Sequence, residues 1–331
     1  MFSKKFIRNA ALVLVLATFL AAVFIVTKRT LYENSGGYDY KADFFAMDTV
    51  VSVRSESDVT KDIEDIFSQY QNVLDCNNEG SEVYRLNQTG SITASDILSE
   101  TVSDVLNLNS QYGSLTDITV GRLTALWNVT GENPTVPEES EIKAALETVG
   151  TDNISINGDE IVLKNNAALD FGAVGKGAVL DACLDYLDKN ACKKTYISTG
   201  SSLLLYGDGS FDVSITNPDG GILAAVKTEQ CFLSTSGGYE RFFEADGKTY
   251  CHIIDPRTGY PTETDLTTVT VFSESGIESD FLSTMIFLDG SENIEKYLHS
   301  DKYKIFAADK NKKLYVSDGL DYEVSDEAYG K

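Results

Sequence analysis

Apolar side chains recur along this chain with two different periods. Between residues 63 and 74 they stand three or four positions apart, as Ile63, Phe67 and Tyr70 do, which is the spacing of a single helix face. Val51 and Val53 stand two apart in a β-branched run that is typical of a strand. On these patterns we expect helices over residues 63–74, 94–112, 138–149, 177–187 and 277–288, and strands over residues 50–53, 266–272 and in short pieces between 195 and 244.

Two short polar segments predict hairpin turns. Residues 157–159, Asn-Gly-Asp, separate two apolar runs of strand length, and residues 245–248, Ala-Asp-Gly-Lys, separate two more. The helices and strands do not alternate in the regular order of a doubly wound sheet. We therefore predict an α+β domain with mixed or antiparallel sheets and flanking helices.

The N-terminus differs from the rest of the chain. Residues 10–26 are apolar apart from Thr18, with basic residues on both sides, and as a helix they would span about 25 Å. Within residues 1–29 we expect a signal anchor or a cleaved signal peptide, and we favour the anchor because no small-x-small cleavage site follows. Residues 30–42 are polar and predict a linker to a catalytic domain at 43–331. The protein would then lie at the cell membrane with an extracytoplasmic catalytic domain.

Charge and composition narrow the function further. The chain carries 27 Lys and Arg against 51 Asp and Glu, a net charge of −24, which excludes nucleic-acid binding through a basic surface. The five cysteines are too sparse, and odd in number, for a disulfide framework. With two histidines in all, a His-rich metal site is impossible.

A carboxylate and a hydroxyl share one face of the last predicted helix. Asp280 and Thr284 stand four positions apart, on the face that also carries apolar residues, while Ser275 and Glu278 have the spacing of a capping box. A buried carboxylate with a hydroxyl one turn later suits a hard cation such as Mg²⁺. The alternative is a solvated aspartate favoured by the helix dipole.

Residues 170–177, Asp-Phe-Gly-Ala-Val-Gly-Lys-Gly, form a glycine-rich turn before a helix. Such a turn presents free N–H groups that attract phosphate, and Lys176 could add a positive charge. The spacing matches neither the P-loop nor the dinucleotide-binding motif. An ordinary tight turn remains the alternative.

His252 follows a predicted strand and precedes a turn made rigid by Pro256 and Pro261. Beside Asp255 and Arg257 it could act as a general base or contact a phosphate, or it could be a structural histidine at a hairpin end. Residues 234–239 offer hydroxyls and amides on a nearby loop, although such loops are common.

Taken together, these segments resemble the ApbE family of FAD:protein FMN transferases. No single segment decides, but their order and spacing over nearly the whole chain after the leader are specific. They are residues 46–49 (AMDT), 81–87 (SEVYRLN), 117–121 (DITVG), 126–127 (LW), 170–177 (DFGAVGKG), 235–241 (TSGGYER), 252–261 (HIIDPRTGYP) and 280–284 (DFLST).

The resemblance implies a role for each matching residue. The side chains of Asp280 and Thr284 and the backbone carbonyl of Ala173 would bind Mg²⁺, with Ser283 as a further contact. His252 would stand beside the reacting phosphates and deprotonate or orient the acceptor hydroxyl. The positions that would contact FAD are Met47, Leu115, Thr116, Asp117, Asp170, Lys176 and Ile254.

The reaction implied is Mg²⁺-dependent transfer of FMN from FAD to a Ser or Thr hydroxyl of an acceptor protein, with release of AMP. The expected acceptor carries a small FMN-binding domain of a membrane or extracellular electron-transfer system. Because the nucleophile is not in this chain, two alternatives stay open: an FAD pyrophosphatase giving FMN and AMP, and a non-catalytic flavin-binding protein.

Four residues, in three segments, depart from the family pattern. Asp48 replaces a glycine, which would restrict its turn, and Ser201-Ser202 replaces a commoner Gly-Asn or Gly-Asp pair. Asn77 stands where many relatives have an aromatic residue that can stack on a ring of FAD. Tyr70 and Trp127 are the candidates to supply that stacking instead.

Overall fold

The computed structural model describes residues 37–329 of the chain. The predicted anchor or signal peptide, residues 1–29, and the linker up to residue 36 lie outside the described residues. Strand β1 (Tyr40–Ala46) begins inside the predicted linker, so residues 40–42 belong to the sheet, and the chain from Tyr40 onward forms one compact unit. No helix within residues 37–329 is both long and apolar enough to cross a membrane.

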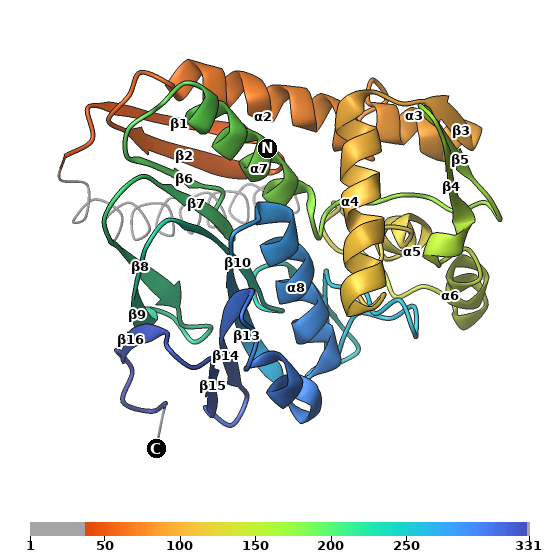
Figure 1. The fold of residues 1–331 in the computed structure, drawn as a ribbon. Helices are drawn as coiled ribbons and strands as arrows, with labels where there is room; N and C mark the ends of the chain where they lie inside the picture. The colour runs from red at the N-terminus through yellow and green to blue at the C-terminus, as the bar shows by residue number, and fades with distance from the viewer. Residues whose placement is uncertain (1–36, 330–331) are drawn as a thin grey trace, which may run out of the picture. The chain divides into compact units, whose positions relative to one another are not determined.

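An eight-stranded sheet runs through the described part of the chain, in the order β1-β2-β6-β7-β10-β13-β14-β15 (Figure 1). Every neighbouring pair in it is antiparallel. The strands after β1 are β2 (Thr49–Ser55), β6 (Thr195–Ser198), β7 (Ser202–Tyr206), β10 (Cys231–Ser236), β13 (Leu266–Ser273), β14 (Tyr303–Asp309) and β15 (Leu314–Val316). The predicted strands at 50–53 and 266–272 are confirmed as β2 and β13.

Helix α7 (Gly175–Lys189) packs against both α2 (Thr60–Leu74) and α8 (Gly276–Asp289), and all three helices pack against this sheet. All three were predicted from helical spacing. Helix α2 buries Ile63, Phe67 and Leu74, and the first two join a core with Val51 of β2. Helix α8 is buried on nearly all sides, so a polar side chain on it needs a partner from the protein or a ligand.

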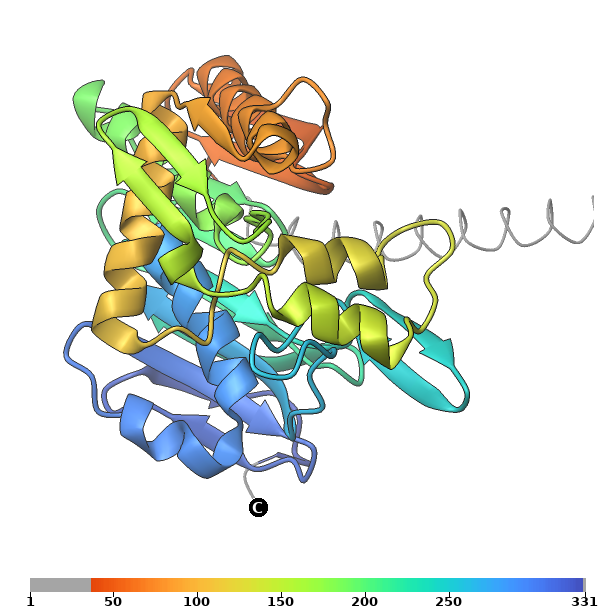
Figure 2. The same ribbon diagram turned by 90° about the vertical axis from the view of Figure 1, so that its right-hand side faces the viewer.

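A second antiparallel sheet, β16-β9-β8, packs on another part of the main sheet. It comprises β8 (Phe211–Thr216), β9 (Ile222–Thr228) and β16 (Asp321–Val324). Strands β11 (Phe242–Ala245) and β12 (Lys248–Cys251) form the hairpin predicted around residues 245–248, which Figure 2 shows in cyan beside helices α5 and α6. His252 follows directly after this hairpin.

The remaining elements form a lobe beside α8 (Figure 1). They are α3 (Glu82–Thr89), β3 (Ser91–Thr93), α4 (Asp96–Tyr112), α5 (Gly121–Trp127), α6 (Glu139–Leu146), β4 (Ile154–Asn157) and β5 (Glu160–Leu163), with a short 3-10 helix at Thr151–Asn153. A second 3-10 helix, Ser291–Tyr297, follows α8 and packs against it. The predicted turn at 157–159 joins β4 to β5, and the predicted helices 94–112 and 138–149 correspond to α4 and α6. Helices α3 and α5 were not predicted. The arrangement confirms an α+β fold with antiparallel sheets and flanking helices.

Candidate functional site

A cavity of about 380 Å³ lies where the β1–β2 turn, the N-terminus of α7, the end of β10 and helix α8 meet. All twelve residues predicted from the sequence line it. They are Met47, Leu115, Thr116, Asp117, Asp170, Ala173, Lys176, His252, Ile254, Asp280, Ser283 and Thr284. Residues that are far apart in the sequence are therefore brought into one site.

Asp280 lies on α8 and is only 5% exposed. Its Oδ2 accepts a hydrogen bond from the backbone N–H of Gly177 at 2.6 Å, and its Oδ1 accepts one from the hydroxyl of Ser202 at 2.7 Å. Both donors are neutral, so within the described residues a buried carboxylate at the cavity has no cationic partner. The alternative of a solvated aspartate is wrong, and the environment favours a bound cation.

Hydroxyl groups continue the polar surface next to Asp280. The Oγ of Ser236, at the end of β10, lies 3.1 Å from Oγ1 of Thr284 and 2.9 Å from Oγ of Ser283. Ser283 also donates to the carbonyl of Asp280 at 3.0 Å, so its proton is already used. Carboxylate, hydroxyl and carbonyl oxygens are the ligands that suit Mg²⁺.

The described residues contain no group of three or more His, Cys, Asp or Glu side chains that could hold a metal ion. A site built on Asp280 would therefore supply few protein ligands. This is how Mg²⁺ is commonly bound, because it keeps several waters and takes further oxygens from substrate phosphates. The donor set thus fits Mg²⁺ bound together with a phosphate-containing substrate.

Only half of the predicted capping box forms at the start of α8. The side chain of Ser275 accepts from the N–H of Glu278 at 3.3 Å. The carboxylate of Glu278 does not reach back to Ser275; it accepts from the hydroxyls of Ser273 and Tyr112. Glu278 therefore ties α8 to β13 and α4.

Several polar groups of the turn at residues 170–177 already make hydrogen bonds within the protein. Asp170 accepts from the N–H of Gly172 at 2.8 Å and from the hydroxyl of Thr124 at 2.6 Å, so its carboxylate shapes the turn. The N–H of Gly175 donates to a carbonyl and that of Gly177 to Asp280, so these two amides are not free for phosphate. The half-buried Lys176 remains as the group that can contact phosphate.

Asp117 and Thr116 also have structural partners. Oδ1 of Asp117 accepts from the N–H and the hydroxyl of Thr119, while Oδ2 makes no hydrogen bond within the described residues. Burial raises the pKa of Asp117, against the effect of the two bonds from Thr119. The hydroxyl of Thr116 donates to the carbonyl of Phe281 at 2.9 Å. Of the side-chain oxygens of Thr116 and Asp117, Oδ2 of Asp117 is thus the one that remains available to a ligand in the cavity.

Met47 and Asp48 form the turn between β1 and β2, with φ angles of 50° and 56°. Aspartate tolerates this left-handed region better than most residues, which is why the turn forms although glycine would be free of strain. The N–H of Met47 donates to Gln71, and Arg241 donates to the carbonyl of Asp48 at 2.9 Å. The turn is thereby fixed at the cavity from two sides.

His252 is held by the carbonyl of Arg241. Its backbone N–H donates to this oxygen at 3.0 Å, and its Nδ1 lies 3.2 Å from the same atom. Since a carbonyl can only accept, Nδ1 carries the proton and Nε2 keeps its lone pair. Burial, with the nearby charges of Arg241 and Lys176, lowers the pKa of His252 to about 4. The ring is therefore neutral at pH 7 and able to accept a proton.

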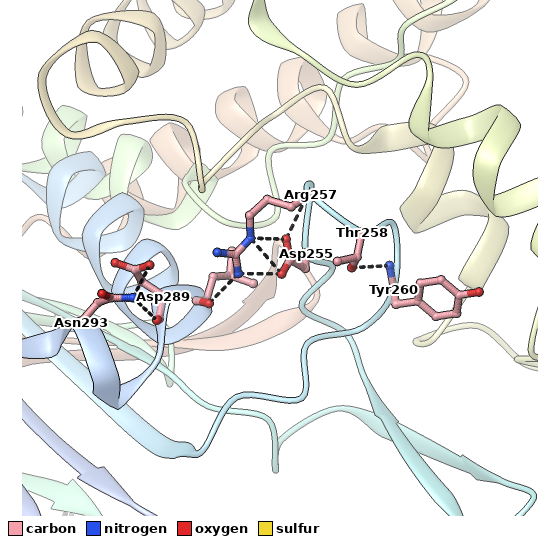
Figure 3. A network of polar contacts seen from close by, with 7 residues as sticks. Asp255, Arg257, Thr258, Tyr260, Asp289 and Asn293 are labelled. Carbon is pink, nitrogen blue, oxygen red and sulfur yellow. Dashed lines mark hydrogen bonds and ion pairs between the residues drawn. The ribbon is translucent and has the colours of Figure 1, made fainter.

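Asp255 and Arg257, which stand close to His252 in the sequence, do not take part in the site. Figure 3 shows the guanidinium of Arg257 paired with both oxygens of Asp255, at 2.7 Å for the shortest contact. The same guanidinium donates to the carbonyl of Leu288 at the end of α8. The pair fastens the loop after His252 to this helix, and neither residue lines the cavity.

Neither candidate for ring stacking is placed to perform it. Trp127 is fully buried and donates from Nε1 to the carbonyl of Gly259 at 2.8 Å. Tyr70 lines a different cavity. Asn77 does line the main cavity. Ser236 and Arg241 also line the cavity, and Ser202 donates to Asp280. The sequence places these three residues in candidate segments but assigns them no role, because their spacing does not show which partner each would contact.

Comparison with known protein families matches the part of the chain that contains these site residues. Residues 47–307 match the family model of the ApbE family. The chain belongs to the ApbE family. The FAD:protein FMN transferase of Treponema pallidum is 30% identical over 272 residues, which cover 73% of this chain and 75% of the relative. A protein of the same name from Klebsiella pneumoniae is 25% identical over 263 residues, covering 77% and 83%.

Solved structures show the same fold. The ApbE protein of Thermotoga maritima superposes with a TM-score of 0.79 at 24% identity, covering 85% of this chain and 97% of the other. The apo form of the flavinyl transferase ApbE of Pseudomonas stutzeri gives 0.74 at 23% identity, covering 86% and 96%. The likeness to these structures is one of fold.

Proposed function

We propose that this protein transfers FMN from FAD to a Ser or Thr hydroxyl of an acceptor protein and releases AMP. The observation that carries the proposal is the cavity itself. It combines a buried carboxylate with neutral partners, Asp280, a lysine, Lys176, and a histidine that is neutral at pH 7, His252. The names of the relatives in Treponema pallidum and Klebsiella pneumoniae support the same reaction.

Asp280 and Thr284, with the carbonyl of Ala173 and Ser283 beside them, would hold Mg²⁺. When bound, Mg²⁺ neutralises negative charge on the pyrophosphate of FAD, including the charge that grows on the departing AMP. Ser202 and the N–H of Gly177 keep the carboxylate of Asp280 in one orientation. This pre-organisation reduces the reorganisation needed when the ion binds.

His252 would take the proton of the acceptor hydroxyl. The hydroxyl oxygen forms a bond to the FMN-side phosphorus, the bond from that phosphorus to the bridging oxygen breaks, and AMP leaves with the electron pair. The proton moves to Nε2 of His252, which is unprotonated at pH 7 because burial lowers its pKa to about 4. Proton transfer of this kind accelerates such reactions by roughly 10²–10⁴-fold.

Lys176 would contact the phosphates, and Oδ2 of Asp117 would contact a donor group on FAD. Lys176 is the half-buried cation at the start of α7, next to the turn that carries Ala173. An ammonium beside the pyrophosphate adds to the charge neutralisation and holds the substrate in line for attack. The acceptor we propose is a protein with an FMN-binding domain of an electron-transfer system.

The proposal is tested by following both products. The protein is incubated with FAD, Mg²⁺ and a purified FMN-carrying domain, and the acceptor is examined by flavin fluorescence after denaturing electrophoresis while nucleotides are separated by chromatography. Fluorescent acceptor and AMP in equal amounts support the transferase. FMN and AMP without labelled acceptor would point to an FAD pyrophosphatase, and FAD that is bound but unchanged to a flavin-binding protein.

We also propose that the N-terminal apolar run anchors the protein in the cell membrane with its catalytic domain outside. The support for an anchor is the apolar sequence of residues 10–26. The Lys and Arg residues on its two sides are nearly balanced, so the orientation rests on this being the first span. Cell fractionation with protease added to intact cells tests this. Membrane association with a protease-accessible domain is expected, whereas a protected domain would contradict the orientation.

A further inference from the structure

Helices α7 and α8 hold each other by two matching contacts at their N-termini. The N–H of Gly177 in α7 donates to Oδ2 of Asp280 in α8 at 2.6 Å. In return, the N–H of Gly276 in α8 donates to Oδ1 of Asp181 in α7 at 2.7 Å. In each helix the aspartate stands four positions after the glycine, so one Gly-x-x-x-Asp pattern occurs twice and each copy binds the other.

The two glycines make this crossing possible. A Cβ on Gly177 would lie 2.1 Å from the carbonyl oxygen of Gly276, and a Cβ on Gly276 would lie 2.4 Å from that of Gly177. Both distances are far below van der Waals contact with backbone atoms, which cannot move aside easily. The helices therefore approach at a separation that only glycine allows, and this closeness lets each aspartate reach the amide of the other helix.

Asp181 accepts two further hydrogen bonds from the start of α8, besides the one from Gly276. Its Oδ2 accepts from the N–H of Ile277 at 2.8 Å and from the hydroxyl of Ser275 at 3.2 Å. The N–H groups of Gly276 and Ile277 belong to the first turn of α8 and have no partner within the helix. A negative charge at this position is also favourable to the helix dipole. A side chain from another helix thus fixes both the position and the direction of the N-terminus of α8.

The two aspartates differ in what surrounds them. Asp280 lines the main cavity, whereas Asp181 lines a separate cavity of about 410 Å³ together with Glu100, Asp104 and Asp185. Asp181 therefore cannot contact a substrate in the main cavity. Its effect on that cavity must act through α8, which carries Asp280, Ser283 and Thr284, and through α7, which carries Lys176.

We infer that Asp181 is a positioning residue that sets the placement of the metal-binding face of α8 against the phosphate-contacting turn of α7. The inference rests on the proposed function, since it takes Asp280 and Thr284 as Mg²⁺ ligands. Loss of the Asp181 contacts frees the start of α8 and moves the ligands relative to Ala173 and Lys176. Loss of a group that is hydrogen-bonded directly to a metal ligand typically lowers metal affinity by about 10–100-fold. Asp181 acts on the ligands through α8, so we expect the lower end of this range.

The test measures Mg²⁺-dependent FAD binding, not turnover. FAD binding is followed by flavin fluorescence while Mg²⁺ is varied, for the wild type, Asp181→Ala, Asp181→Asn and Asp280→Ala. The matched control is Asp185→Asn, because this residue lies one turn further along α7, lines the same second cavity and has an exposed contact with Lys189. Thermal unfolding in a chelator reports on the fold of each variant.

Asp181→Ala should raise the Mg²⁺ concentration for half-maximal FAD binding about tenfold or more. Asp181→Asn, which keeps one acceptor oxygen, should raise it less, and Asp185→Asn should not change it. A lower thermal midpoint with an unchanged Mg²⁺ requirement would reduce Asp181 to a structural cap and overturn the inference. If Asp181→Ala does not fold, a wild-type Mg²⁺ requirement in Asp181→Asn overturns it as well. A wild-type requirement in Asp280→Ala would instead refute the proposed metal site.

Discussion

His252 should make the stability of the protein depend on pH between about 4 and 6.5. Burial lowers the pKa of this residue from 6.5 to about 4, so in that interval the unfolded chain binds a proton that the native protein does not. Proton uptake by the unfolded state favours unfolding. The stability linked to His252 is therefore fully present above pH 6.5 and is lost as the pH falls towards 4.

The size of the effect follows from the two pKa values. At pH 5 a histidine with a pKa of 6.5 is almost fully protonated, whereas His252 with a pKa of about 4 is mostly neutral. The linkage relation then gives a loss of about 2 kcal/mol in the free energy of unfolding between pH 8 and pH 5. The substitution His252→Gln removes the titrating group and should remove this part of the pH dependence.

Urea unfolding of the wild type and of His252→Gln at pH 8 and pH 5 measures this difference. The wild type should lose about 2 kcal/mol more than the variant between the two pH values. In the transfer reaction, kcat/KM of the wild type should stay flat well below pH 6.5, and the variant should be slower by roughly 10²–10⁴-fold while binding FAD normally. Equal losses of stability in both proteins, or an acid limb of kcat/KM at pH 6.5, would refute the burial argument.

Three further substitutions, two of them with a matched control, test other parts of the structure. Asp280→Ala should abolish transfer and weaken Mg²⁺-dependent FAD binding in calorimetry, and normal transfer would show that Asp280 is not a metal ligand. Gly177→Ala should lower the free energy of unfolding by about 1–3 kcal/mol, because its Cβ would lie 2.1 Å from a backbone oxygen. In the control Gly175→Ala the new Cβ meets the flexible end of Met47 at 3.2 Å, so the free energy of unfolding should fall less. Equal decreases in the two variants would argue against the close crossing of α7 and α8. Asp48 has a φ of 56°, a left-handed conformation that costs a valine about 1–2 kcal/mol, so Asp48→Val should lower the thermal midpoint. Asp48→Gly should not lower it. A valine variant as stable as the wild type would contradict the left-handed turn.

The fold was predictable where local signals are strong. Helices α2 and α8 contain apolar residues at helical spacing over three turns or more, and the β11–β12 turn contains Asp-Gly, which adopts the required positive φ angles at Asp246 and Gly247. Helix α3 was missed because it is eight residues long and buries only Val83 and Leu86. Helix α5 was missed because it begins with a glycine and has no side-chain cap.

The residues of the site could be predicted from the sequence, but the residues to which they are hydrogen-bonded could not. The resemblance to a family identified twelve residues, and all of them line one cavity. The sequence could not show that Asp170 is bound to Thr124, or that Arg257 reaches Leu288, because these contacts join segments that are distant along the chain. For the same reason Trp127 could be proposed for stacking on a flavin although packing buries it completely.

FMN from FAD should become covalently attached to another protein. The most direct measurement is the intact mass of an FMN-carrying acceptor domain after incubation with this protein, FAD and Mg²⁺. We expect a gain equal to one FMN, which should be absent when Mg²⁺ is chelated and absent when the acceptor Ser or Thr is replaced by alanine. An unchanged acceptor mass, with FMN and AMP accumulating in solution, would contradict it.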